Sequence, residues 1–359
     1  MSVNIYHDDA GNISLLNDKF IGIIGYGNQA KAQALNMRDS GLELIIGVTE
    51  EKHKQRALKD DFNVQPIPDI VDKADFIFLL VSDKNMVPLY EEKIKPRLTS
   101  KKTLVFYSAY NLAFDLMEIP EDIDAILLSP RTTGLGVRET FLNKKGFFTF
   151  LGIYQNASGN AKENLLALAK GVGGLSKGAI ELTFKQAAVL NLFRYQAFTY
   201  AFVQVLMRSV NNLIEEGYPP EAVLIEILLS GEGSYTVEKM VDVGLIKQMN
   251  FHSQTSQYGS LSRAVKFRKV ASDVEEVQKN ILKEIESGKF AEEWQKDTSK
   301  TKLKAYKSLL KKSKFAEIEA RVRKNLKIPD MGEAIKAKYP SEADKLENME
   351  KAKSFYNEI

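Results

Sequence analysis

The 359-residue sequence predicts an α/β domain with a doubly wound parallel sheet, followed by an all-α domain. Three observations support this prediction. Short apolar segments alternate with helix-length segments in the first half, and after about residue 180 the pattern becomes helical throughout. A glycine-rich turn, Gly25-Tyr26-Gly27-Asn28-Gln29-Ala30, joins the first predicted strand to the first predicted helix.

Apolar segments of strand length predict the strands of the sheet. Fully apolar strands that alternate with helices are typical of parallel sheets covered on both faces, and right-handed crossovers then give a Rossmann-type fold. The segment 29–40 predicts the first of these helices, which stops at Gly41. The predicted strands are residues 20–24, 42–48, 76–81, 103–107, 125–128 and 147–153.

The second half of the chain predicts helices only. The segment 184–216 indicates one long, largely apolar helix, Pro219-Pro220 precedes another, and 274–327 is helical with an interruption at Ser287-Gly288. We therefore expect a dinucleotide-binding domain at residues 1–180, a helical domain at 181–328 and a polar C-terminal extension at 329–359.

Composition excludes several classes of function. The chain has no cysteine, which excludes disulfides, thiolate metal sites and a cysteine nucleophile, and which favours a cytoplasmic protein. No apolar segment approaches the roughly 20 residues of a membrane helix. The net charge of +3 is too small to indicate a polyanionic partner. Lysines gather at 296–327, where apolar residues recur among them, so we interpret this segment as a solvated helical face rather than a nucleic-acid surface.

The glycine-rich turn predicts a dinucleotide site. Gly25 allows a tight turn off the strand, and Gly27 has no Cβ to block a pyrophosphate. Ala30 is small enough for close packing between helix and sheet, and the helix N-terminus offers free N–H groups to phosphate oxygens. We expect Gly25, Tyr26, Gly27, Asn28 and Gln29 to bind the cofactor.

The choice between NAD(H) and NADP(H) stays open in the sequence. Glu50 or Glu51, after the second predicted strand, would accept hydrogen bonds from a ribose 2′-hydroxyl and favour NAD(H). The basic residues Lys52, His53 and Lys54 would instead bind the 2′-phosphate of NADP(H). Ser82 and Asp83 follow the third predicted strand, where we expect the nicotinamide ribose to pass.

A series of motifs recurs in a fixed order over roughly residues 15–327. The motifs are Gly25–Ala30, Ala34–Gly41, Ser129-Pro130-Arg131 with Gly134 and Val137-Arg138, Ser158–Lys162, Gly171–Gly174, Thr183-Phe184-Lys185, Leu192-Phe193 with Gln196, Ser253-x-Thr255-x-Gln257-Tyr258-Gly259, and Ser287–Ala291. As a set they resemble the ketol-acid reductoisomerases, also called acetohydroxyacid isomeroreductases.

The resemblance implies an activity and its cofactors. That family converts 2-acetohydroxy acids to dihydroxy acids in branched-chain amino-acid biosynthesis, by alkyl migration followed by hydride transfer from NADP(H). Two magnesium ions hold the substrate oxygens, and carboxylates on two helices hold the ions. In dimeric members the partner subunit supplies one of these pairs, so the resemblance also implies a homodimer or a larger homo-oligomer with a small keto or hydroxy acid as substrate.

This sequence departs from the family at the metal ligands. The first carboxylate pair falls on Asn191 and Tyr195, and of the second pair Glu226 is kept while Ser230 replaces its partner. Glu232 substitutes for Ser230 only if the backbone bends there. Asn donates an uncharged oxygen and Tyr is a poor magnesium ligand near neutral pH, so we do not expect secure magnesium binding.

Other family positions are also changed. A family lysine falls on Arg131 and a family histidine on Ala109, whereas the substrate-contacting serine is kept as Ser253. The resemblance leaves Arg131, Glu226 and Ser253 as catalytic candidates. We expect that the dinucleotide site persists and that the two-metal isomerisation is weakened or lost. The alternative is a paralogue that keeps dinucleotide binding but is either non-catalytic or a metal-independent keto-acid reductase.

Overall fold

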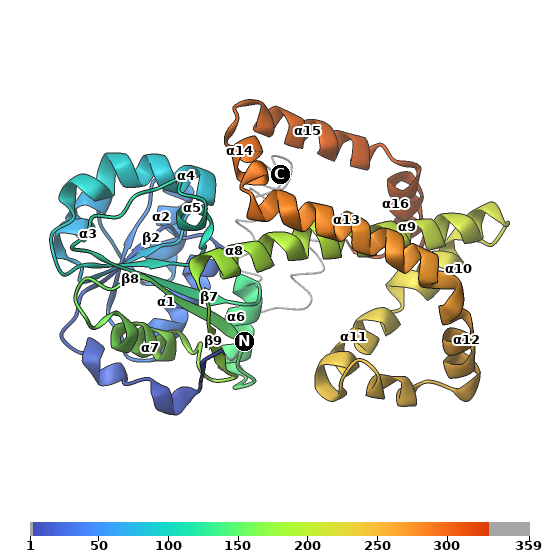
Figure 1. The fold of residues 1–359 in the computed structure, drawn as a ribbon, viewed down its shortest axis with the longest axis horizontal. Helices are drawn as coiled ribbons and strands as arrows, with labels where there is room; N and C mark the ends of the chain where they lie inside the picture. The colour runs from blue at the N-terminus through green and yellow to red at the C-terminus, as the bar shows by residue number, and fades with distance from the viewer. Residues whose placement is uncertain (1–2, 330–359) are drawn as a thin grey trace. The chain divides into compact units, whose positions relative to one another are not determined.

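In the computed structural model, residues 3–329 are described, so the predicted extension at 329–359 lies almost wholly outside the described residues. The chain divides into an N-terminal unit, Met1–Leu192, and a C-terminal unit, Phe193–Ile359. Within residues 3–329, all strands belong to the N-terminal unit and the C-terminal unit is helical (Figure 1).

The N-terminal unit contains a single nine-stranded sheet. Its order is β1-β9-β8-β7-β6-β5-β2-β3-β4, and all neighbours from β7 to β4 are parallel. The strands are β1 (Ile5–Tyr6), β2 (Ile21–Ile24), β3 (Leu44–Gly47), β4 (Asn63–Val64), β5 (Phe76–Leu79), β6 (Thr103–Phe106), β7 (Asp124–Pro130), β8 (Thr149–Gln155) and β9 (Ala179–Glu181).

Each segment predicted as a strand forms one, and the doubly wound order is confirmed. The expectation of a parallel sheet needs one correction, because β8 pairs antiparallel with β7 and β1 pairs antiparallel with β9. A strand buried on both faces is apolar whether it runs parallel or antiparallel to its neighbour. Composition therefore does not distinguish a parallel strand from an antiparallel one. The sequence analysis also missed β1, β4 and β9, which have only two or three residues each.

Helices cover both faces of this sheet (Figure 1). Ile23 packs with α1 and α7 in one apolar cluster, and the next residue, Ile24, packs with α3 and α5 in the other. This alternation follows from the two-residue period of a strand. The helices of this unit are α1 (Asn28–Asp39), α2 (Glu51–Lys59), α3 (Ile67–Lys73), α4 (Asp83–Leu89), α5 (Tyr110–Ala113), α6 (Gly134–Leu142), α7 (Ala161–Val172) and α8 (Phe184–Phe193, whose last residue begins the next unit).

The predicted long helix at 184–216 is helical from Phe184 to Glu215, with a π-helical segment, η5, between α8 and α9. The predicted interruption near Gly288 is present, where Gly288 has φ +83°. The elements of the C-terminal unit are η5 (Arg194–Thr199), α9 (Tyr200–Glu215), α10 (Pro220–Leu224), the π-helical η6 (Ile225–Leu229), α11 (Glu232–Val243), η7 (Lys247–Phe251), α12 (Gln254–Ala264), α13 (Arg268–Glu286), α14 (Lys289–Gln295), α15 (Thr298–Lys311) and α16 (Lys314–Asn325).

The C-terminal unit buries little apolar surface among its described residues. Its compact cluster consists of Val210 from α9, Val223 and Leu224 from α10, and Ile318 and Val322 from α16. No helix in residues 3–329 combines the length and apolar character that a membrane span requires.

Candidate functional site

The glycine loop joins β2, which lies between β5 and β3 in the sheet, to α1. Gly25 has φ +106°, and a Cβ there would lie 2.4 Å from the carbonyl oxygen of Leu80, so the loop packs directly on the end of β5. Around Gly27, by contrast, no atom lies within 4 Å of the position a Cβ would take. Gly27 is the N-cap of α1, whose first N–H groups have no intrahelical acceptor. Open space beside free N–H groups fits a pyrophosphate.

The other loop residues differ in what they offer to a ligand. The Tyr26 side chain is fully buried, and its hydroxyl donates to Asp60 Oδ2 at 2.9 Å. Burial raises the pKa of Tyr26 far above its ordinary value. Its side chain is therefore part of the core, which leaves its backbone for a ligand. Gln29 Nε2 donates to the Thr132 carbonyl at 2.7 Å, while Gln29 Oε1 is buried without a hydrogen-bond partner in the described chain.

The loop after β7 packs against this glycine loop. A Cβ on Gly134 would lie 2.2 Å from the carbonyl oxygen of Asn28, so α6 begins in direct contact with the start of α1. Thr133 caps α6 and accepts a hydrogen bond from the Gly136 N–H at 3.2 Å. The residue just before this loop, Arg131, is thus close in the chain to the dinucleotide crevice.

Glu50 stands at the carboxyl end of β3 as the N-cap of α2. Its carboxylate lies 2.8 Å from Lys52 Nζ, and this hydrogen bond lowers the pKa of Glu50. Burial lowers the pKa of His53, which is therefore neutral at pH 7. Glu51 instead accepts a hydrogen bond from Gln55 one turn further along α2. Of the three basic residues in the first turn of α2, Lys52 is paired with Glu50, His53 is uncharged at pH 7 and Lys54 is exposed.

Asp83 lies where β5 ends and α4 begins, and Ser82 is the N-cap of that helix. Asp83 Oδ1 is shielded from solvent without a hydrogen-bond partner among the described residues, and burial raises the pKa of this carboxyl. The backbone carbonyl of Asp83 accepts a hydrogen bond from Asn111 Nδ2 at 3.0 Å. Sequence reasoning missed Asn111, although it follows a predicted strand at the edge where parallel sheets bind ligands.

Arg131 and Asn191 are brought together in the N-terminal unit. Arg131 Nη2 donates to Asn191 Oδ1 at 3.1 Å, and Nη1 donates to Ser129 Oγ at 3.2 Å. The guanidinium also lies 4.6 Å from the centre of the Phe150 ring. The amide oxygen that replaces a family metal ligand is therefore engaged by a cationic side chain.

The remaining metal-ligand positions lie in the C-terminal unit. Tyr195 is exposed on η5, and the Arg194 guanidinium lies 5.4 Å from its ring centre. Glu226 lies on η6, and Ser230 Oγ accepts a hydrogen bond from the Glu232 N–H at 3.3 Å. Gly231, with φ +82°, supplies the bend that would bring Glu232 round.

Of the four family metal-ligand positions, only Glu226 holds a carboxylate in this chain. Paired divalent ions need several anionic oxygens to offset their repulsion. Asn191 is held by a guanidinium, and Tyr195 and Ser230 carry hydroxyls where the family has carboxylates. In the part of the chain that the structure describes, no three His, Cys, Asp or Glu side chains gather as a metal site.

The last two family positions have local structural roles. Ser253 is the N-cap of α12, where its Oγ accepts the Ser256 N–H at 3.2 Å. Ala109 is buried as the residue before α5, and its methyl group has no acid–base chemistry.

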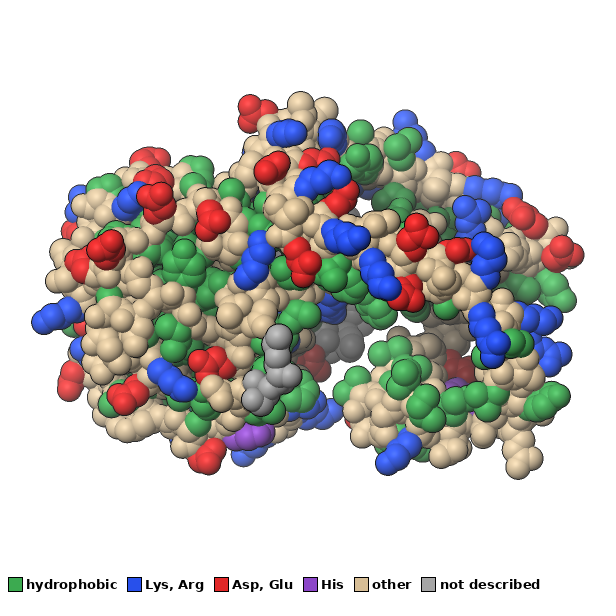
Figure 2. Space-filling model, in the orientation of Figure 1, with side chains coloured by type: hydrophobic (Ala, Val, Ile, Leu, Met, Phe, Trp, Pro, Cys, Tyr) green, Lys and Arg blue, Asp and Glu red, His purple; other side chains and the backbone are tan. Residues whose placement is uncertain are grey.

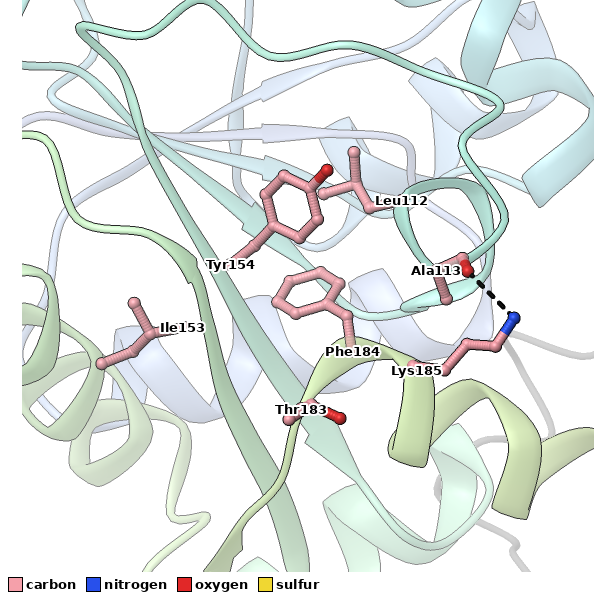
Figure 3. A pocket seen from close by; sticks show the side chains of 7 residues that line it. All are labelled: Leu112, Ala113, Ile153, Tyr154, Thr183, Phe184 and Lys185. Carbon is pink, nitrogen blue, oxygen red and sulfur yellow. Dashed lines mark hydrogen bonds between the residues drawn. The ribbon is translucent and has the colours of Figure 1, made fainter. Parts of the chain in front are cut away.

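A separate surface pocket of about 280 Å³ lies beside the start of α8 (Figure 3). The rings of Tyr154 and Phe184 meet edge to face at 5.3 Å, and Lys185 Nζ donates to the Ala113 carbonyl at 3.4 Å. Leu112, Ile153 and Thr183 complete its lining. The pocket contains none of the cofactor or catalytic candidates.

The fold and the glycine loop together define an oxidoreductase that binds a nicotinamide dinucleotide. Residues 15–178 match the acetohydroxy acid isomeroreductase NADPH-binding domain, and residues 184–328 match the ketol-acid reductoisomerase C-terminal domain. The chain therefore belongs to the ketol-acid reductoisomerase family, as the sequence motifs predicted.

Individual relatives agree with this assignment. The chain is 38% identical over 283 residues to "Putative ketol-acid reductoisomerase 3" of Saccharolobus solfataricus, which covers 78% of this chain and 84% of that protein. It superposes with a TM-score of 0.82 on an NADH-preferring ketol-acid reductoisomerase from an uncultured archaean, at 32% identity, over 89% of this chain and 98% of the other. An oxidoreductase structure from Jannaschia sp. CCS1 shares the fold, with a TM-score of 0.55 at 17% identity over 75% of this chain and 97% of that chain.

Proposed function

We propose that this protein is an NADH-dependent reductase of 2-oxo acids that has lost the two-metal alkyl migration of its family. The observation that carries the proposal is the hydrogen bond from Arg131 to Asn191 Oδ1. A guanidinium at this oxygen repels a divalent cation, and the neutral amide adds no charge to attract one. A guanidinium is also well suited to hold a substrate carboxylate through paired N–H donors.

The preference for NADH is supported by the turn between β3 and α2. Glu50 keeps an ionised and half-exposed carboxylate, which accepts hydrogen bonds from a ribose 2′-hydroxyl and repels a 2′-phosphate. Lys52 is paired with this carboxylate and His53 is neutral at pH 7, which leaves Lys54 as the one of these three basic residues to offer charge to the extra phosphate of NADPH. A relative of known structure is NADH-preferring.

We also propose that two copies of the chain associate through α11 and α12. Neither helix contains a buried residue, and large apolar side chains are exposed along both (Figure 2). Contiguous apolar surface of this kind marks an interaction site. The family resemblance implies that the partner at this surface is a second copy of the same chain. The exposed side chains on the two helices are Tyr235, Val237, Val241, Tyr258 and Leu261, and the segment between the helices adds Leu245, Ile246 and Phe251.

The loss of the metal step is tested by rebuilding the ligands. Unmodified protein should oxidise NADH with a 2-oxo acid in the presence of EDTA, and calorimetry should detect no Mg²⁺ binding. A variant with Asn191→Asp, Tyr195→Glu and Ser230→Glu should gain Mg²⁺ binding, and saturating Mg²⁺ at a hundred times Kd should stabilise it by about 2.7 kcal/mol.

The matched control keeps Asn191 and introduces Tyr195→Gln and Ser230→Gln, which add similar volume without charge. This control should not bind Mg²⁺. The proposal is wrong if the unmodified protein converts 2-acetolactate in a Mg²⁺-dependent reaction with kcat of about 1 s⁻¹ or more, which lies within the ordinary range for enzymes.

A further inference from the structure

A buried carboxylate at the end of α2 contacts the glycine loop through two side chains. Asp60 is the C-cap of α2 and is only 6% exposed. Its Oδ2 accepts a hydrogen bond from the Tyr26 hydroxyl at 2.9 Å and lies 2.9 Å from Lys31 Nζ, which also donates to Oδ1 at 3.2 Å. Hydrogen bonds to a charged group are stronger when water is excluded, so this carboxylate is a fixed point in the core.

Asp60 is itself held by α1. Arg38 Nη1 donates to the Asp60 carbonyl at 2.6 Å, and its guanidinium lies 5.0 Å from the centre of the Phe62 ring. The Phe62 ring in turn meets the Tyr26 ring edge to face at 5.8 Å. Tyr26 is therefore held at its ring as well as at its hydroxyl.

Tyr26 and Lys31 lie on either side of the part of the loop that faces open space. Tyr26 precedes Gly27, the N-cap of α1, and the Lys31 N–H donates to the Gly27 carbonyl at 2.9 Å. Gly27 has no side chain that could fix its own backbone, and glycine has the greatest backbone freedom of all residues. The residues on either side of Gly27 can supply this rigidity, and both bond the same carboxylate.

We propose that Asp60 is a positioning residue for the dinucleotide. Through Tyr26 and Lys31 it holds the N–H groups at the start of α1 in the arrangement that binds a pyrophosphate, which lowers the entropy lost when the cofactor binds. Asp60 is too deeply buried to touch the cofactor, so it acts only through these two residues. The helix that ends at Asp60 begins beside Glu50, where we expect the ribose. The assignment rests on dinucleotide binding and not on the proposed reduction of 2-oxo acids.

The Tyr26 hydroxyl is tested against a matched tyrosine. Tyr26→Phe removes one oxygen and keeps the ring. Tyr90→Phe makes the same change in the other apolar cluster of the N-terminal unit, where the Tyr90 hydroxyl donates to the Glu118 carbonyl at 3.0 Å. Each variant should lower Tm by about 2 to 4 °C, because each loses one hydrogen bond of a buried tyrosine. Only Tyr26→Phe should raise the Kd, by about tenfold for NADH and NADPH alike, since both contain the pyrophosphate.

Asp60 is tested by two substitutions of similar size. Asp60→Asn keeps an oxygen that can accept the Tyr26 hydroxyl, whereas Asp60→Leu removes every acceptor. Asp60→Leu should raise both Kd values by about tenfold or more, and Asp60→Asn should bind both dinucleotides more tightly than Asp60→Leu. Adding Tyr26→Phe to Asp60→Leu should weaken binding no further, because the hydroxyl acts through the carboxylate. Fluorescence titration of the full-length protein measures each Kd, and circular dichroism checks that each variant is folded.

Unchanged Kd values in Tyr26→Phe, with Tm lowered as in Tyr90→Phe, would show that the network only stabilises the core and that the proposal is wrong. Additive effects of Tyr26→Phe and Asp60→Leu would also contradict it. Both results leave the proposed reduction of 2-oxo acids untouched, because they concern binding alone. A protein that binds neither dinucleotide would overturn the proposed function together with the role of Asp60. If Asp60→Leu does not fold, the two tyrosine variants decide the question.

Discussion

Glu50 and Glu51 are neighbours in the sequence, but the structure gives their carboxylates different partners. Glu50 caps the turn after β3 and is paired with Lys52, whereas Glu51 is bonded to Gln55 within α2. We expect Glu50→Gln to weaken NADH binding by about tenfold, which corresponds to one lost charge-assisted hydrogen bond, and to strengthen NADPH binding. Fluorescence titration with each dinucleotide measures both effects.

Glu51→Gln is the matched control, with the same change one residue along. It should alter neither Kd by more than about twofold, since exposed charges away from the ligand have small effects. The reverse result, in which only Glu51→Gln loses NADH affinity, would assign the ribose to Glu51 instead.

The residues of the cofactor loop show which predictions from the motif agree with the folded structure. The motif predicted that both Gly25 and Gly27 are required, and the fold itself gives a reason for Gly25 alone. Gly25 is needed because its φ is positive and β5 lies against it, whereas Gly27 faces open space. Tyr26, which the motif also predicted as a cofactor contact, has its side chain in the core, because the hydroxyl of this tyrosine finds its partner in Asp60, 34 positions away.

Among the elements, α1, α6 and α7 are joined through one asparagine. Asn36 on α1 donates to the Val172 carbonyl at the end of α7, and its Oδ1 accepts from Arg138 Nη1 on α6 at 3.0 Å. Arg138 Nη2 also bonds Asp39 Oδ2 at 2.6 Å. Since α1 and α6 both begin at the dinucleotide loop, this junction fixes the loop as well as the helices.

Arg138→Gln should therefore lower the free energy of unfolding by about 2 kcal/mol, because it leaves Asn36 with an unsatisfied buried acceptor. Urea denaturation monitored by circular dichroism measures the change. Arg97→Gln is the control, since Arg97 forms an equally short but exposed pair with Asp72, worth about 0 to 1 kcal/mol. Equal losses in the two variants would contradict a structural role for the α1–α6 junction.

For the whole molecule, the exposed apolar residues of α11, α12 and the segment between them lead to a prediction about assembly. Analytical ultracentrifugation should show a dimer at micromolar concentration. The double variant Val241→Glu and Ile246→Glu should sediment as a monomer with a lower Tm, because these side chains are 68% and 74% exposed in the single chain and charges there oppose apolar association.

Leu142→Glu provides the control, because Leu142 is also a large exposed apolar residue, at 59%, but lies on α6 of the N-terminal unit. It should leave the dimer intact. A monomeric unmodified protein, or a dimer that survives the double variant, would show that α11 and α12 are not the interface.

The sequence by itself determined the six longer strands, the division into an α/β and a helical part, the dinucleotide loop and the family, because these depend on local periodicity and on short motifs. It also located the substitutions at Asn191, Tyr195 and Ser230. Only the tertiary structure decided that Arg131 engages Asn191 and that Tyr26 bonds Asp60, since these pairs join positions 60 and 34 residues apart. Contacts between distant positions arise from packing of the folded chain, and no local pattern records them.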